Sequence, residues 1–232
     1  MPHYKIADIV CKFTPAYEET AAWYESYRTD EPLDFHKEII VSEERIKYLT
    51  EKGEGITPAM AENIHLCTLF NAMLVKFKGS YIHSSALKFD DKVYLFSANS
   101  GVGKSSHTRR WCRLYPDRAQ VINDDKPSFR LVDGKCIVYG TPFAGGTDIQ
   151  VNTSGELGAI VFIERSDKNY LETLNTSSAI KLLLEQTPHS ANAIMGDKLL
   201  ALYSELLTKY PVYKLYCTDS DEAVSVAMNI IN

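Results

Sequence analysis

The chain has 232 residues, of which 45% are hydrophobic and 24% charged, and its formal net charge is −5. This length suits one large domain, or a domain with a small appendage, and we expect it to bury an extensive core. No apolar run approaches the ~20 residues that cross a membrane, so we expect no membrane span. The acidic balance disfavours nucleic acid as a partner, because proteins that bind it usually present a basic face.

The N-terminal residues and the cysteines bear on the cellular compartment. Residues 1–5 lack the basic start and apolar core of a secretory signal, so we expect a cytoplasmic protein. The five cysteines are odd in number and widely scattered. This pattern is typical of buried thiols and predicts neither a disulfide framework nor a zinc site.

Residues 1–78 are predicted to form a small N-terminal α+β subdomain packed on the rest of the chain. Alternating apolar positions predict a strand at 4–10, and another strand is expected at 35–41. The aromatic-rich segment 17–27 fits either a helix or a strand. No repeat and no low-complexity tract interrupts this region.

Two helices are expected in the second half of this subdomain. Ser42 is a suitable N-cap for a short helix that Gly53 ends, and acidic residues occupy its first turn. Thr57-Pro58 starts a longer helix, because proline is favoured at the first helical position. The apolar stripe of this longer helix consists of Ile64, Leu66, Leu69, Phe70, Met73, Leu74 and Phe77.

Residues 79–232 are predicted to form a second domain of alternating strands and helices. The expected strands are 81–89, 92–97, 119–123, 127–132, 135–139, 158–163 and 212–216, and the expected helices are 104–115, 177–185, 191–209 and one starting at Asp219. Asp133-Gly134 is a strong hairpin signal between two of these strands. Successive hairpins do not fit a purely parallel sheet, so the fold class is α/β with a mixed sheet.

The stretch between strand 92–97 and helix 104–115 has the pattern of a phosphate-binding loop. A strand, a turn of small residues and Gly-Lys-Ser at a helix start place backbone N–H groups around one anion. Lys104 would reach the β- and γ-phosphates, and Ser105 would offer its hydroxyl to Mg²⁺. The nucleotide-binding residues are therefore Asn99, Ser100, Gly101, Val102, Gly103, Lys104, Ser105 and Ser106.

The match to the loop consensus has one departure, since Ala98 stands where glycine is usual. Its methyl group is tolerable if that position needs no positive φ. The ordinary alternative is a flexible Gly-Ser turn with one solvated lysine. The strand before the loop and the helix after it disfavour that alternative.

Two adjacent carboxylates, Asp124 and Asp125, follow the apolar strand at 119–123. A site for a metal–nucleotide needs one carboxylate to hold Mg²⁺ and another to accept a hydroxyl proton. We expect Asp124 to be the base and Asp125 the metal ligand, with the exchanged assignment open. Alone, such a pair is more often a solvated turn; beside a phosphate loop the functional interpretation is favoured.

Two further features are expected near the loop. Pairing of strands 81–89 and 92–97 would bring His83 beside it, although a histidine among apolar strand residues is usually a core side chain. The turn-rich segment 139–147 is either a mobile surface loop or a substrate loop. Its candidate substrate residues are Thr141, Gly145, Gly146 and Thr147.

These motifs together resemble the kinase domain of HPr kinase/phosphorylase and, more distantly, the nucleotide core of phosphoenolpyruvate carboxykinase. The resemblance rests on residues 93–111, on 122–127 and on His83, which precedes Lys104 by the 21 residues seen in that kinase family. It covers roughly residues 80–220. It implies an atypical P-loop domain with Mg-ATP-dependent phosphotransferase activity, in which His83, Lys104 and Asp124 are catalytic.

Several departures from the family narrow what is expected. Gly146 stands where relatives often have a lysine, and the segment that supports dephosphorylation in HPr kinases is not found. Residues 1–78 do not resemble the partner domain of those kinases, so HPr is not expected as the acceptor.

Two functions of different classes remain open. One is a kinase that phosphorylates a hydroxyl on a small protein, peptide or metabolite. The other is an ATP-binding regulator without turnover. A carboxykinase is disfavoured by the short chain, and a homo-oligomer is left open.

Overall fold

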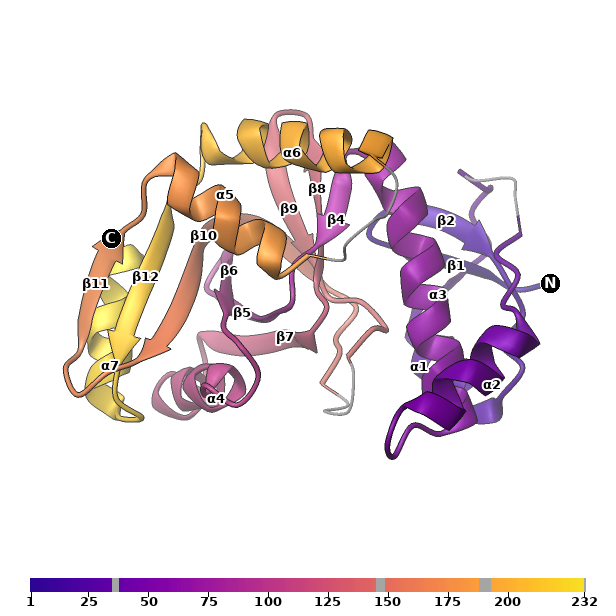
Figure 1. Ribbon diagram of the computed structural model, residues 1–232, viewed down its shortest axis with the longest axis horizontal. Helices are drawn as coiled ribbons and strands as arrows, with labels where there is room; N and C mark the ends of the chain where they lie inside the picture. The colour runs from indigo at the N-terminus through magenta and orange to yellow at the C-terminus, as the bar shows by residue number, and fades with distance from the viewer. Residues whose placement is uncertain (35–37, 145–148, 188–192, 232) are drawn as a thin grey trace.

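The computed structural model describes residues 1–34, 38–144, 149–187 and 193–231 (Figure 1). The strands are β1 (His3–Ile6), β2 (Ile9–Lys12), β3 (Arg28–Thr29), β4 (Gly79–Tyr81), β5 (Ser84–Phe89), β6 (Lys92–Ser97), β7 (Ala119–Asp125), β8 (Ser128–Val132), β9 (Lys135–Tyr139), β10 (Ser154–Arg165), β11 (Tyr170–Thr173) and β12 (Val212–Cys217). The α-helices are α1 (Glu18–Tyr24), α2 (Glu43–Lys52), α3 (Pro58–Leu74), α4 (Lys104–Leu114), α5 (Thr176–Glu185), α6 (Ala193–Leu207) and α7 (Asp221–Ala227).

A mixed nine-stranded sheet organises the molecule, in agreement with the predicted α/β class. Its main strand order is β4-β8-β9-β10-β6-β5-β7, and β12 and β11 extend it from β10. β10 runs parallel to β6 and β12 but antiparallel to β9. The sheet curls, so that Asn123 of β7 forms an isolated bridge with Gln150, just before β10.

Helices cover both faces of this sheet (Figure 1). Successive side chains of a strand point to opposite faces. Val93 and Leu95 of β6 accordingly pack in one core with residues of α5 and α6. Tyr94 and Phe96 pack in another core with residues of α4 and α7. Burial on both faces explains why residues 93–96 of this strand are all apolar.

The N-terminal elements form a separate layer at the end of the molecule that carries the N-terminus (Figure 1). They comprise the three-stranded sheet β2-β1-β3 and helices α1 to α3. Their aromatic core includes Tyr24 and Phe70, and it also contains Tyr139 and Phe143 from beyond β8. The core of the N-terminal region is thus completed by residues of the second half of the chain.

Local signals placed the helices of this region correctly. The Ser42 side chain accepts a hydrogen bond from the Arg45 amide at the start of α2. Thr57 does the same for Met60 at the start of α3, where Pro58 is the first helical residue. Segment 17–27, which the sequence left open, consists of helix α1 and a following 3-10 helix at Glu25–Tyr27.

Two predicted strands of this region are wrong. The expected strand 4–10 is a hairpin of β1 and β2, because Ala7 and Asp8 adopt positive φ values of 50° and 56° and reverse the chain. In the described part of the expected strand 35–41, only Glu38 forms a bridge, to Lys12. Residues 35–37 lie outside the described residues.

Three predictions in the second half need correction, and one strand was missed. The expected strand 81–89 is broken at Ile82 and His83, because the His83 amide donates to the Gln186 carbonyl. The predicted strand 158–163 is longer, and the edge strand β11 was not predicted. The last helix begins after the N-cap Ser220, not at Asp219. The hairpin at Asp133-Gly134 is confirmed, with positive φ at both residues.

All five cysteines are free, and four of them are buried. Within the described ranges, no helix combines the length and the apolar character needed to cross a membrane.

Candidate functional site

The predicted phosphate loop joins the end of β6 to the start of α4. Gly101 and Gly103 have φ values of 77° and 119°, which side chains with a Cβ rarely adopt. Ala98 is 4% exposed and is not among the residues with positive φ, so the methyl group that replaces the consensus glycine packs without backbone strain. The departure from the consensus at this position is therefore compatible with the loop.

The start of α4 leaves polar groups available to a ligand. Its N-cap, Gly103, provides no side-chain hydrogen bond to the first turn. In the part of the chain that the structure describes, the Lys104 ammonium has neither an ion pair nor a hydrogen bond. Backbone N–H groups at a helix start and a lysine at its first residue are the elements of an anion site.

Arg165, at the end of β10, contacts the backbone of the phosphate loop. Its guanidinium donates to the carbonyl groups of Gly101 at 2.6 Å and Val102 at 3.0 Å. The sequence offered no signal for this contact, because 60 or more residues separate the partners and only the parallel pairing of β6 with β10 brings them together.

Strand register brings the acidic pair to the loop. Ser84 of β5 pairs with Ser97 of β6 on one side and with Asp125 of β7 on the other. The end of β6, the start of β5 and the end of β7 therefore lie side by side. The expected pairing of the two strands that flank the Asp90-Asp91 turn is confirmed.

Asp124 lies against the helix that carries the phosphate loop. Its Oδ1 accepts a hydrogen bond of 2.9 Å from the Ser105 hydroxyl. The Arg109 guanidinium of α4 lies 3.8 Å from the other carboxylate oxygen. Asp124 is 4% exposed.

Asp125 lies beside His83 and Lys126. The His83 Nε2 atom is 3.2 Å from Asp125 Oδ1, and the Lys126 ammonium pairs with the second oxygen. Burial raises the pKa of Asp125, but the hydrogen bond from His83 and the charge of Lys126 outweigh that effect and hold the pKa below its usual value. Asp125 is therefore an ionised carboxylate at neutral pH.

A chain of polar side chains links His83 to the phosphate loop. His83 Nδ1 lies 3.2 Å from the Gln186 side-chain oxygen, and the Gln186 amide nitrogen donates to Asn99 at 3.2 Å. The backbone carbonyl of His83 also accepts a hydrogen bond from the Ser97 hydroxyl. Gln186 was not a sequence candidate, because it follows α5, about 100 residues away.

The predicted substrate loop is only partly described. Thr141 is buried, and its hydroxyl donates to the Lys126 carbonyl. Asn123 donates to the Thr141 carbonyl and accepts from the Asp125 and Lys126 amides. Thr141 thus supports the turn after the acidic pair. Gly145, Gly146 and Thr147 lie outside the described residues.

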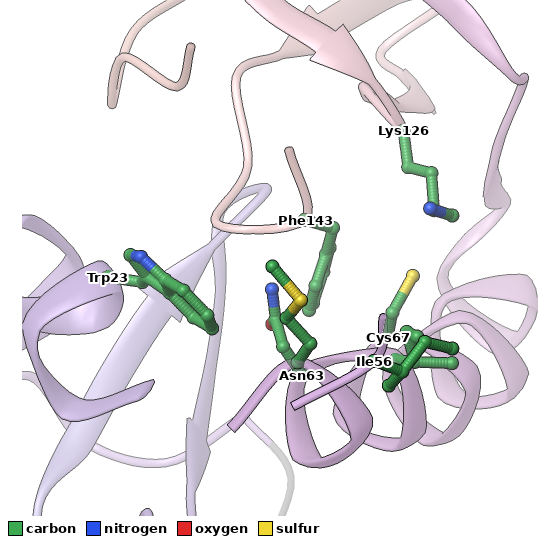
Figure 2. A pocket seen from close by; sticks show the side chains of 8 residues that line it. Trp23, Ile56, Asn63, Cys67, Lys126 and Phe143 are labelled. Carbon is green, nitrogen blue, oxygen red and sulfur yellow. The ribbon is translucent and has the colours of Figure 1, made fainter. Parts of the chain in front are cut away.

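Two pockets flank these groups. One, of about 350 Å³, lies between the loop and the ends of β10 and β12, and Val102, Ser106, Arg165, Cys217 and Thr218 are among its lining residues. The parallel strands β6, β10 and β12 end on this side of the sheet. Ligands of open α/β sheets commonly bind outside such carboxyl ends. The other pocket, of about 200 Å³, lies between the N-terminal helices and Lys126 (Figure 2).

The oxygen donors at the loop fit magnesium. The Ser105 hydroxyl and the Asp124 carboxylate are hard oxygen ligands held 2.9 Å apart. Among the described residues, no group of three or more His, Cys, Asp or Glu side chains could hold a metal ion by itself. Mg²⁺ bound through one or two protein oxygens and the phosphates of a nucleotide needs no such cluster.

Comparison with known proteins finds similarity to solved structures, and at a coarse level only. No protein-family model matches the chain, and no curated protein matches it. A solved structure of the HPr(Ser) kinase/phosphatase from Coxiella burnetii is similar with a TM-score of 0.38 and 12% identity, covering 64% of this chain and 94% of that one. A likeness of this size assigns neither a family nor an activity to this chain.

Proposed function

We propose that this protein is a Mg-ATP-dependent phosphotransferase that moves the γ-phosphoryl group to a hydroxyl. The observation that carries this proposal is the hydrogen bond between Ser105, at the start of α4, and Asp124, at the end of β7. A loop hydroxyl joined to a strand-end carboxylate is the pair that holds Mg²⁺ in P-loop enzymes.

This contact favours the exchanged assignment of the two carboxylates. Asp124 and Ser105 would hold Mg²⁺, which neutralises the charge that develops on the phosphates during transfer. Lys104 would bind the β- and γ-phosphates, and the N–H groups of the loop would surround them. The pocket at the ends of β10 and β12 is our proposed site for the nucleoside.

Asp125 would act on the acceptor. Its carboxylate would take the proton of the acceptor hydroxyl as the oxygen–phosphorus bond forms and the bond to ADP breaks. His83 contacts one of its oxygens and Lys126 contacts the other, so these two residues would orient the carboxylate. His83 in turn is connected to the phosphate loop through Gln186 and Asn99. These hydrogen bonds would link the acceptor side of the site, at Asp125, to the nucleotide side, at the loop.

The test begins with nucleotide binding. Lys104→Ala should lower Mg-ATP affinity at least tenfold, because the charge on the phosphates is lost while the backbone cradle remains. Lys168→Ala, at an exposed lysine outside the site, is the matched control and should bind as the wild type does. Calorimetry on the full chain decides between these outcomes. Unchanged affinity in Lys104→Ala would mean that the loop is not the nucleotide site.

Turnover separates the kinase from a regulator. Radiolabelled ATP should transfer phosphate to at least one member of a panel of serine peptides and hydroxylated small molecules, or hydrolyse slowly to ADP. The Asp124→Asn/Asp125→Asn double variant sets the background. A wild-type protein that binds Mg-ATP but never exceeds this background would be a non-catalytic ATP-binding regulator.

A further inference from the structure

The pocket between α1, α3 and Phe143 is lined mostly by apolar side chains. Figure 2 shows Trp23 on one side, Phe143 in the middle, and Ile56 and Cys67 near the opposite end, with Lys126 above them. Met60, Asn63 and Ile64 complete the lining. The residues come from the N-terminal region, which provides six of the eight, and from the segment that follows the acidic pair.

The polar groups of Asn63 and Lys126 in this lining have partners inside the protein. Asn63 accepts a hydrogen bond from the Tyr24 hydroxyl at 2.8 Å and donates to the Pro142 carbonyl at 3.1 Å. The Lys126 ammonium is paired with Asp125. A ligand in the pocket therefore meets apolar surface and few free polar groups, which favours an uncharged, apolar group.

The size of the pocket limits that group to about one ring or one branched chain. Its volume is about 200 Å³. A cavity of about 150 Å³ holds benzene, and pockets for drug-sized molecules start near 300 Å³. A single phenyl, leucyl or indole group fits between these limits.

The pocket adjoins the proposed acceptor side of the site. Lys126 lines both this pocket and a third pocket, whose polar lining includes His83 and Asp125. The apolar pocket and the pocket of the proposed base are therefore neighbours.

We infer that the phosphate acceptor is a hydroxyl compound that carries one aromatic or branched apolar group, and that this group binds in the pocket between α1, α3 and Phe143. The inference rests on the proposed function, since it treats Asp125 as the base of phosphate transfer. It assigns the N-terminal region to acceptor selection. A peptide with serine beside an apolar residue and a small apolar alcohol share this chemistry.

Binding to the full chain, with and without Mg-ATP analogue, tests the inference. The peptide probes are N-acetylated serine dipeptide amides with phenylalanine, leucine or glycine next to the serine. The small-molecule probes are 3-phenylpropan-1-ol and propan-1-ol. Calorimetry should show that the phenylalanine or leucine dipeptide binds at least tenfold more tightly than the glycine dipeptide, or that 3-phenylpropan-1-ol binds at least tenfold more tightly than propan-1-ol. Burial of one such apolar group is worth roughly that factor.

Variants of α3 identify the place of binding. Ile64→Phe fills the pocket and should abolish the preference for the apolar probe. Thr68→Phe, at an exposed position one turn along the same helix, is the matched control and should retain it. Ile64→Ala enlarges the pocket and should shift the preference from the phenylalanine probe toward a fourth dipeptide probe with tryptophan next to the serine. This variant covers the case that the filled variant folds poorly.

The outcomes separate the two proposals. Equal binding of apolar and glycine probes, no binding of either, or an unchanged preference in Ile64→Phe would overturn the inference even if Mg-ATP binds normally. If the protein does not bind Mg-ATP, the proposed function fails. The titrations of the probes in the absence of nucleotide then still test whether the pocket binds an apolar group. A preference confined to peptides, or to alcohols, supports the inference and names the source.

Discussion

At the scale of the residue, the two neighbouring carboxylates differ because successive side chains of a strand leave it on opposite sides. Asp124 contacts Ser105 and Arg109 of α4. Asp125 contacts His83, which lies next to the end of α5. The two adjacent carboxylates thus lie in different environments. The same substitution should therefore have different effects on binding and transfer at the two positions.

Amide substitutions measure that difference. Asp125→Asn should keep Mg-ATP affinity within about threefold and lower phosphate transfer roughly 10²-fold or more, because a general base acts mainly in the transition state. Asp124→Asn should weaken both Mg-ATP binding and transfer, because a metal ligand also supports the ground state. Titration calorimetry and transfer rates on the purified variants give the two quantities. The reverse pattern would restore Asp124 as the base.

At the scale of the element, α4 is held by one buried face. His107, Thr108 and Trp111 are its buried residues, and the Trp111 indole donates to His107 Nε2 at 3.0 Å. The Thr108 hydroxyl lies 2.8 Å from that of Ser85 on β5. These contacts fix the helix that presents Lys104 and Ser105.

The buried His107 should make this helix sensitive to acid. Burial lowers the pKa of His107 to about 4, whereas an unfolded chain has the ordinary value near 6.5. The unfolded state therefore binds more protons between these values, so stability falls as the pH is lowered from about 6.5 to about 4, by roughly 3 kcal/mol at most.

Urea unfolding at pH 4, 5, 6 and 7 measures this slope for the wild type and for His107→Gln. Glutamine retains an acceptor for the Trp111 indole but does not titrate. The variant should lose most of the pH dependence between 4 and 6.5 that this histidine contributes. Identical slopes in the two proteins would show that His107 is not its source.

At the scale of the whole molecule, Phe143 ties the N-terminal region to the main sheet. It is 3% exposed and packs against Tyr24 of α1 and Phe70 of α3, with ring centroids 6.1 and 5.6 Å apart. Its own segment continues from β9 of the large sheet. The proposed boundary at residues 78 and 79 stays a prediction, but the two sides share this core.

Phe143→Ala should therefore lower the free energy of unfolding by about 3–5 kcal/mol, the usual cost of truncating a buried aromatic residue. Leu200→Ala, at a residue that is 44% exposed, is the control and should change it by less than about 0.5 kcal/mol. We expect one cooperative transition for the wild type, followed by circular dichroism and fluorescence. Two separate transitions in the wild type would show that the regions unfold independently.

The sequence by itself determined the features that depend on neighbouring residues. Caps at Ser42 and Thr57, the turn at Asp133-Gly134 and the strand, loop and helix around Lys104 follow from local hydrogen bonds and backbone preferences. The apolar runs predicted most strands of the main sheet. These signals act over a few residues, so they can be recognised without knowledge of the partners.

Only the tertiary structure decided how distant segments meet. The partners Arg165 and Gln186, the break before β5 and the edge strand β11 depend on long-range contacts that no local pattern encodes. The same holds for which carboxylate faces Ser105. Strand register sets that choice, because a shift of one residue would exchange the faces of the two carboxylates and leave the sequence pattern unchanged.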